Sequence, residues 1–125
     1  MTEVPFDLEQ HLKHVPSFWY LATPYSGHEH GVEVAAIEAA KMTAWLQDRH
    51  VSVFCPIVHG HAANKYMNLP RTYDVWLTID HPFMRAAWGL IIGKLSNWET
   101  SFGVEAERKH FRQQKKPYTF MEWPQ

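Results

Sequence analysis

The stretch GLIIGKLSNWETSFGVEAERKHFRQQKKPYTFM, residues 89–121, predicts a strand, a helix and a second strand. Gly89 to Leu95 and Pro117 to Met121 are short apolar runs of strand length. Between them, Ser101 to Gln114 carries apolar residues at helical spacing. A strand–helix–strand unit forms two parallel strands joined by a right-handed crossover. The stretch therefore predicts an α/β fold with a parallel sheet.

The preceding residues extend the same alternation. Strands are expected at Ser17 to Ala22 and Val51 to Phe54, and helices at Val32 to Arg49 and Arg71 to Ala87. We interpret Val58 to Pro70, which holds two histidines and two asparagines, as a loop. The order β-α-β-α-β-α-β predicts a flavodoxin-like or Rossmann-like open parallel sheet in three layers.

Length and composition restrict the function classes. The 125 residues suit a single domain, 1–125, with residues 1–16 as an N-terminal extension. The net charge of −1 provides no basic field for nucleic acid, so small molecules are the expected partners. The single cysteine, the lack of an apolar leader and the lack of a membrane-length apolar run predict a cytoplasmic protein without a membrane partner.

Ligands of open parallel sheets bind at the carboxyl ends of the strands. The loops after Ala22, Phe54 and Leu95 are therefore the expected site. The first of these loops holds Thr23, Pro24 and Ser26, and the last helix begins with Ser101 and Gly103. Both segments are candidate anion sites, and simple capping and turn formation is the alternative interpretation.

Two carboxylates fall on apolar helix faces. Glu107 shares a face with Val104 and Phe111, so it is expected to point inward, as a catalytic group or as the partner of a backbone group or Trp N–H. Glu105 lies on the charged face. Asp80 lies on the apolar stripe of its helix, where its side chain caps a second helix before Pro82 or, with Glu107, forms an acid/base pair.

The histidines do not predict a metal site. His59-Gly60-His61 fits no zinc-ligand spacing, and one cysteine, Cys55, cannot build a thiolate site. His59 is expected to contact the substrate from its loop rather than to bind a metal. Cys55 is expected to be a small buried apolar residue. No metal or other cofactor is expected.

Taken together, these motifs resemble one family. Tyr20-Leu-Ala-Thr-Pro-Tyr-Ser26, Phe54-Cys-Pro-Ile-Val-His59, Trp76 with Asp80, and Ser101-Phe-Gly-Val-Glu-Ala-Glu107 before Pro117 are similar to the nucleoside 2-deoxyribosyltransferase superfamily. The similarity is greatest to its DUF1937 branch and runs from about Trp19 to Tyr118. It implies a flavodoxin-like sheet and N-glycosidic chemistry without a cofactor.

The resemblance also implies individual roles. A catalytic glutamate four residues after a glycine and about ten before a proline corresponds to Glu107, which would attack C1′ of the sugar. Asp80 would hold the sugar and assist with protons, and Tyr20 would lie beside the nucleophile. Thr23, Pro24, Ser26, His59 and Trp76 are the expected substrate contacts together with Ser101 and Gly103.

Position 101 divides the superfamily. Transferases of free nucleosides tend to carry an acidic residue there, whereas nucleotide hydrolases carry a serine that binds the 5′-phosphate. Ser101 therefore predicts a hydrolase of (deoxy)nucleoside 5′-monophosphates, with a deoxyribosyltransferase or a non-catalytic nucleotide-binding module as alternatives.

The sequence departs from the family pattern at two places. Ala87-Trp88 stands where the family often has an aspartate before the third strand, and the transferases' asparagine-containing C-terminal segment has no counterpart before Gln125. The family and the Trp-rich composition imply a homodimer or higher homo-oligomer.

Overall fold

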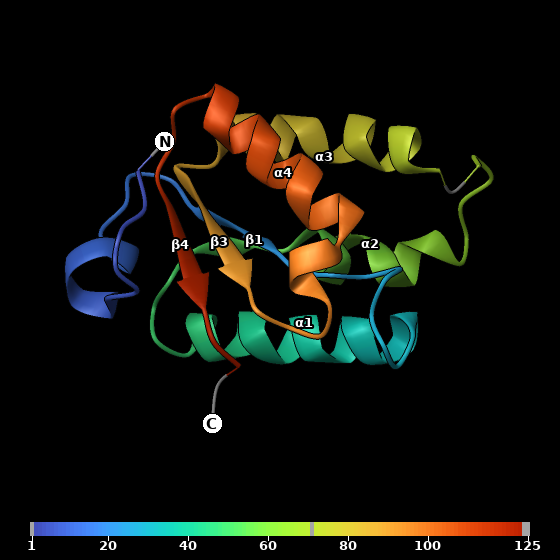
Figure 1. The fold of residues 1–125 in the computed structure, drawn as a ribbon, viewed down its shortest axis with the longest axis horizontal. Helices are drawn as coiled ribbons and strands as arrows, with labels where there is room; N and C mark the ends of the chain where they lie inside the picture. The colour runs from blue at the N-terminus through green and yellow to red at the C-terminus, as the bar shows by residue number, and fades with distance from the viewer. Residues whose placement is uncertain (1, 71, 124–125) are drawn as a thin grey trace.

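A four-stranded parallel sheet organises the molecule. The structure, a computed structural model, describes residues 2–70 and 72–123 (Figure 1). The sheet has the order β2-β1-β3-β4. Its strands are β1 (Trp19–Ala22), β2 (Val53–Phe54), β3 (Gly89–Gly93) and β4 (Tyr118–Met121). The helices are η1 (Leu8–Leu12), α1 (Val32–Gln47), α2 (Pro56–Asn64), α3 (Tyr73–Ala86), η2 (Trp98–Thr100) and α4 (Phe102–Gln113).

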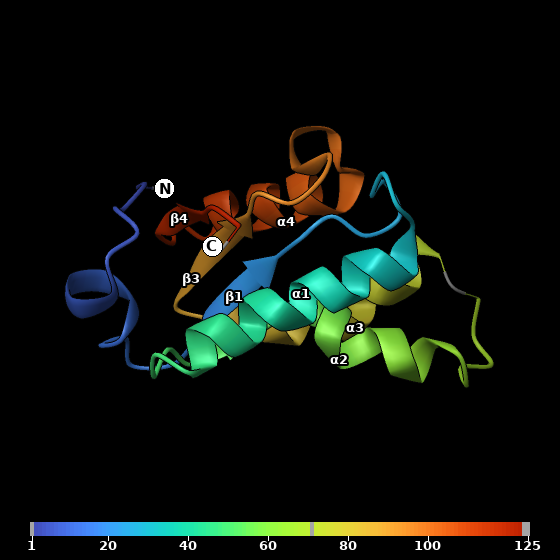
Figure 2. The ribbon, with the colours of Figure 1, turned by 90° about the horizontal axis from the view of Figure 1, so that it is seen from below.

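The strand pairing confirms the predicted fold class. β1 pairs with both β2 and β3, and β3 pairs with β4, always in parallel. Figure 1 shows α1 on one side of the sheet and α3 and α4 on the other, and in Figure 2, seen from below, α1 lies in front of the strands. This arrangement is the three-layer, flavodoxin-like α/β sandwich. The chain leaves β1 toward β2 and leaves β3 toward β4, so the two sheet neighbours β1 and β3 form a topological switch point.

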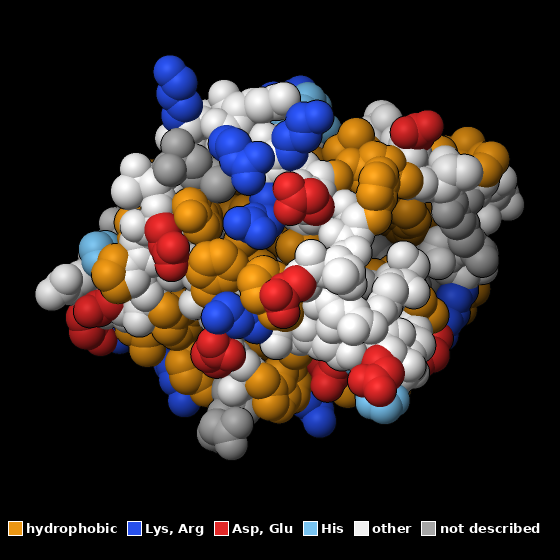
Figure 3. Space-filling view, in the orientation of Figure 1, with side chains coloured by type: hydrophobic (Ala, Val, Ile, Leu, Met, Phe, Trp, Pro, Cys, Tyr) orange, Lys and Arg blue, Asp and Glu red, His pale blue; other side chains and the backbone are white. Residues whose placement is uncertain are grey.

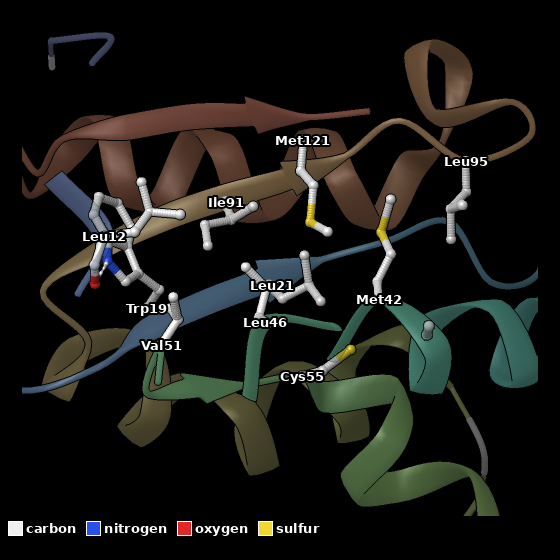
Figure 4. Close-up of a cluster of buried hydrophobic side chains, with 11 residues drawn as sticks. Leu12, Trp19, Leu21, Met42, Leu46, Val51, Cys55, Ile91, Leu95 and Met121 are labelled. Atoms are coloured by element: carbon white, nitrogen blue, oxygen red, sulfur yellow. Dashed lines mark hydrogen bonds between the residues drawn. The ribbon is translucent and has the colours of Figure 1, made fainter. Parts of the chain in front are cut away.

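Each face of the sheet has its own apolar core. On one face, Leu21 and Ile91 of the strands lie opposite Met42 and Leu46 of α1, all fully buried (Figure 4). On the other face, Leu90 and Ile92 pack with Met84, Val104 and Phe111 of α3 and α4. Strands buried on both faces explain why β1 and β3 are continuous apolar runs rather than alternating ones.

The N-terminal segment packs onto this framework. Leu12 of η1 is fully buried, and its carbonyl accepts a hydrogen bond from the indole N–H of Trp19 at 3.1 Å. Val4 N–H donates to the carbonyl of Tyr118 at 2.8 Å, beside the outer edge of β4. The segment therefore covers the end of one core and one edge of the sheet.

The prediction of a loop from Val58 to Pro70 was wrong in its first half, because α2 spans Pro56–Asn64. Pro56 lies in the first turn of α2, where its missing N–H costs nothing. Glycine, asparagine and two histidines weaken the sequence signal. Tertiary packing stabilises α2 instead, because Gly60 lies against the indole of Trp76. A Cβ at Gly60 would be 2.8 Å from Trp76 Cζ3.

The predicted interruption at Pro82 was also wrong. α3 continues from Tyr73 to Ala86 with Pro82 inside it, so Asp80 does not cap a second helix. Pro82 removes one helical hydrogen bond, a cost of about 3 kcal/mol in an isolated helix. Packing of the following residues offsets this cost: Met84 is buried, and the Phe83 ring stacks on Phe54 with a centroid distance of 4.1 Å.

Gly89 provides a test of the packing at the centre of the sheet. A Cβ at this position would be 2.5 Å from Trp19 Cζ3 and 2.8 Å from the Pro117 carbonyl oxygen. We expect Gly89→Ala to lower the free energy of unfolding by about 1–3 kcal/mol, because neither neighbour can move freely. Urea denaturation measures this loss. Gly27→Ala, where nothing lies within 4 Å of the added carbon, is the control; equal stability of the two variants would contradict the packing.

Candidate functional site

A cavity of about 300 Å³ opens at the carboxyl end of β1. Four segments form its walls: β1 with its following loop, α2, α3 and the start of α4. This position beside the switch point agrees with the general rule for open parallel sheets. The residues that line the cavity are Tyr20, Thr23, Tyr25, Ser26, Pro56, Ile57, Gly60, His61, Asn64, Tyr73, Trp76, Leu77, Asp80, Met84, Ser101, Phe102, Gly103 and Glu107.

Polar contacts fix the loop that follows β1. His28 is buried and bonds the Glu38 carboxylate of α1 through Nε2, while its Nδ1 accepts from the His30 N–H at 3.0 Å. The Asn97 amide donates to the Gly27 carbonyl at 2.8 Å, which joins this loop to the one after β3. These bonds hold the loop residues that line the cavity against α1 and the end of β3.

Glu107 occupies the inner wall of the cavity. It lies in α4 between Val104 and Phe111, both buried in the core, so its carboxyl group points inward as the helical spacing predicted. Burial is the main cause that raises the pKa of Glu107 to about 8. The Tyr20 hydroxyl opposes this shift and the charge of Asp80 adds to it. No cation compensates the Glu107 carboxylate among the described ion pairs.

Asp80 reaches the same cavity from α3. Burial raises the pKa of Asp80 to about 6. Its Oδ1 is buried and has no hydrogen-bond partner among the described residues. Two inward carboxyl groups from separate helices, Asp80 and Glu107, therefore act on each other electrostatically within one cavity.

Tyr20 completes this group from the strand below. The residue is fully buried, and burial together with the charges of Glu107 and Asp80 raises the pKa of its phenol. Tyr20 therefore keeps its proton. The hydroxyl is near enough to Glu107 to favour the ionised carboxylate, yet it forms no hydrogen bond of normal geometry within the described chain. The Tyr20 O–H can therefore donate to Glu107 or to a bound molecule.

The cavity collects unsatisfied polar atoms. Seven buried side-chain atoms have no hydrogen-bond partner in the described part of the chain, and four of them belong to cavity-lining residues. These four are Tyr20 Oη, Thr23 Oγ1, Asn64 Oδ1 and Asp80 Oδ1. Each such atom costs free energy unless a water or a ligand satisfies it. Their concentration makes this cavity the candidate site for a polar ligand.

The start of α4 forms the outer wall. Ser101 is the N-cap, and its hydroxyl oxygen accepts from the Val104 N–H at 3.3 Å, as the capping interpretation predicted. The hydroxyl hydrogen of Ser101 remains available as a donor. A Cβ at Gly103 would meet nothing within 4 Å, so a ligand can approach the backbone on that side of the first turn. The capping and anion-binding interpretations of Ser101 are therefore compatible.

Eight of the ten residues expected in the site line the cavity. They are Glu107, Asp80, Tyr20, Ser101, Gly103, Ser26, Thr23 and Trp76. Pro24 and His59 are not among the lining residues. The His59 ring packs instead on Phe54 and Phe83, with centroid distances of 5.3 and 5.5 Å. His61, two residues further along α2, is the histidine that faces the cavity.

Sequence reasoning missed several lining residues, chiefly His61 and Asn64 of α2. The Tyr25 hydroxyl lies 2.6 Å from His61 Nδ1, and His61 Nε2 lies 3.1 Å from a carboxylate oxygen of Glu33. A helical assignment for α2 would have placed His61 and Asn64, three residues apart, on one face. Without it, no sequence signal joined Tyr25, His61 and Glu33.

Residues 2–70 and 72–123 contain no group of three or more His, Cys, Asp or Glu side chains arranged to hold a metal ion. Cys55 is buried, and burial raises the pKa of its thiol to about 11. The thiol therefore stays protonated. Within the same residues, no helix has both the length and the apolar character needed to cross a membrane.

Comparison with known proteins adds one match. The family described as "Domain of unknown function (DUF1937)" matches residues 17–123, which includes every wall of the cavity. No curated protein matches the chain.

The carboxyl groups make stability depend on pH. Because the pKa of Glu107 is raised in the folded protein, the fold retains a proton that the unfolded chain loses above about 4.5. This contribution to stability is fully present below pH 4.5 and is lost as the pH rises through about 8. We expect Glu107→Gln to exceed the wild type in unfolding free energy by about 1–3 kcal/mol at pH 8.5, and not at pH 4.5.

Urea denaturation at the two pH values measures this difference. Glu105→Gln, on the exposed face of the same helix, is the matched control and should change little at either pH. A Glu107→Gln variant that is less stable than the wild type at pH 8.5 would show that the carboxylate is stabilised in the fold rather than strained.

Proposed function

The chain belongs to the DUF1937 family, and from its cavity we propose that it is an N-glycosidase that hydrolyses the base–sugar bond of a (deoxy)nucleoside 5′-monophosphate. The observation that carries this proposal is the uncompensated Glu107 carboxyl group in the cavity with Asp80 and Tyr20. An inward carboxylate without a cation is costly to keep, and such perturbed pairs concentrate at catalytic sites. The link of the family to the nucleoside 2-deoxyribosyltransferases is part of the same proposal.

The reaction assigns each group a task. The ionised Glu107 attacks C1′, the C1′–N bond breaks, and its electron pair leaves with the base. Water then cleaves the glycosyl ester, which releases the sugar phosphate and restores Glu107, as in retaining glycosidases. Tyr20 donates its hydroxyl hydrogen to the Glu107 carboxylate or to the sugar, and Asp80 accepts from a sugar hydroxyl.

Neutral donors hold the phosphate in this proposal. The described lining residues include no lysine or arginine. The hydroxyl groups of Ser101, Ser26 and Thr23 and the first N–H groups of α4 remain as phosphate donors, and a helix N-terminus favours negative charge. In this proposal the base contacts the walls formed by α2 and Trp76.

The exposed apolar edge of the cavity suggests where a second copy would bind. Phe102 is 70% exposed and Tyr73 is 37% exposed, and their rings meet edge-to-face with a centroid distance of 4.8 Å. Figure 3 shows hydrophobic side chains together on the surface near the starts of α3 and α4. We therefore place the interface of the proposed homodimer beside the mouth of the cavity.

Glu107→Gln tests the proposed nucleophile. The amide keeps the shape of the side chain but cannot attack C1′, so we expect turnover to fall by about 10³-fold or more. The assay is chromatographic detection of free base from a panel of deoxyribonucleoside and ribonucleoside 5′-monophosphates and the matching nucleosides. Glu105→Gln should retain wild-type turnover.

Three results separate the rival functions. Formation of a new nucleoside when a second free base is added would identify a transferase. Nucleotide binding without any base release by the wild type would identify a binding module. Wild-type turnover by Glu107→Gln would exclude Glu107 as the nucleophile.

Ser101→Asp tests the phosphate site. Aspartate is as good an N-cap as serine, so α4 should remain intact. Its negative charge, however, repels a phosphate. We expect kcat/KM for monophosphates to fall at least about tenfold while kcat/KM for the matching nucleosides is unchanged or rises. An equal effect on both substrate types would place the phosphate elsewhere, and Ser101→Asn is the uncharged capping control.

A further inference from the structure

Three side chains from three separate segments form a hydrogen-bonded chain at the cavity wall. Tyr25 follows β1, His61 belongs to α2, and Glu33 lies in the first turn of α1. The Tyr25 hydroxyl lies 2.6 Å from His61 Nδ1, and His61 Nε2 lies 3.1 Å from the Glu33 carboxylate. Tyr25 and His61 both line the cavity that contains Glu107. The reaction described above assigns no role to this chain.

The carboxylate fixes where the protons lie. The hydrogen bond from His61 is the main cause that lowers the pKa of Glu33. Glu33 is therefore ionised. It therefore accepts the Nε2–H of His61, and in the neutral imidazole Nδ1 accepts the hydroxyl hydrogen of Tyr25. When the ring gains a proton, Nδ1–H donates to the Tyr25 oxygen instead. The hydroxyl hydrogen of Tyr25 is then released toward another acceptor.

The chain also connects solvent to the cavity. The Glu33 side chain is 69% exposed, whereas the His61 side chain is 16% exposed. Protons can therefore reach His61 from the solvent side while Tyr25 faces the ligand side. A tyrosine that receives its proton from a neighbouring histidine is suited to general acid catalysis. Here a carboxylate holds that histidine in place.

The proposed reaction needs such an acid. A base that leaves as an anion is a poor leaving group at neutral pH, so a proton on its ring lowers the barrier. Glu107 must be ionised to attack C1′ and has no proton to give. Asp80, which lines the cavity from α3, is already assigned as the acceptor of a sugar hydroxyl. Protonation of the base therefore falls to another residue on the cavity wall.

We propose, on the premise of the N-glycosidase function, that Tyr25 protonates the departing base and that His61 and Glu33 resupply its proton. As the C1′–N bond breaks, its electron pair goes to the base. The base takes the hydroxyl proton of Tyr25, and Tyr25 takes the Nδ1 proton of His61. The imidazolium becomes neutral imidazole and is later reprotonated from solvent. Tyr25 is thus a catalytic residue, and His61 and Glu33 are positioning and supplying residues.

A pair of substrates with different leaving groups distinguishes this role from a structural one. The probes are 2′-deoxyguanosine 5′-monophosphate and its 7-methyl derivative. The methylated base already carries the positive charge that protonation would supply, so it leaves as a neutral molecule without a proton. For a wild-type enzyme restricted to pyrimidines, the matching pair is uracil and 5-fluorouracil deoxynucleotides, because fluorine makes the base anion a better leaving group.

The tested variants are Tyr25→Phe and His61→Gln. We expect Tyr25→Phe to lower kcat for the ordinary guanine nucleotide by about 10²-fold or more and to change kcat for the 7-methyl substrate by less than about threefold. His61→Gln should show the same selectivity to a smaller extent. With the pyrimidine pair, the loss should be smaller for 5-fluorouracil. Tyr66→Phe, at a tyrosine that is 84% exposed, should leave both rates unchanged.

The experiment distinguishes a wrong proposed function from a wrong proton relay. If the wild type releases no base from any probe, the proposed function is wrong and this assignment falls with it. If the wild type is active but Tyr25→Phe slows both substrates equally, or neither, only the proton relay is refuted. A selective loss in Asp80→Asn, without one in Tyr25→Phe, would assign the acid to Asp80 instead.

Discussion

The rest of this structure depends on the partly buried Glu107 carboxyl group, which faces the cavity without a cation beside it. α4 must present Glu107 inward to keep Val104 and Phe111 in the core, and β1 places the Tyr20 hydroxyl beneath it. Asp80 adds a second carboxyl group rather than a counter-ion. The fold thus accepts an electrostatic cost at the switch point of its sheet, where a ligand can offset it.

The fold could be predicted from sequence because its central strands are unambiguous. β1 and β3 are buried on both faces and appear as continuous apolar runs, and α4 between β3 and β4 has clear helical periodicity. α2 could not be predicted in the same way. Its Gly60 and polar residues lower helix propensity, and the helix depends on packing with α1 and Trp76. The continuity of α3 through Pro82 likewise depends on tertiary contacts of Phe83 and Met84.

The site was predictable to the extent that local patterns defined it. Helical spacing predicted that Glu107 points inward, and Ser101 and Gly103 indicated the start of α4. The other wall depended on α2, so the choice between His59 and His61 required the three-dimensional structure. Only there does His61 meet Tyr25 and Glu33, which lie 36 and 28 residues away in sequence. Their proximity is a property of the fold and has no local signature.

Trapping of the glycosyl-enzyme intermediate tests whether Glu107 is the nucleophile. A 2′-fluoro-arabino nucleoside 5′-monophosphate carries an electron-withdrawing fluorine, which slows hydrolysis of the intermediate ester. Mass spectrometry of the intact protein and of its peptides then locates any covalent sugar phosphate. We expect one added sugar phosphate per chain, attached to Glu107 and absent in Glu107→Gln. Base release without an adduct, or an adduct on another residue, would contradict it.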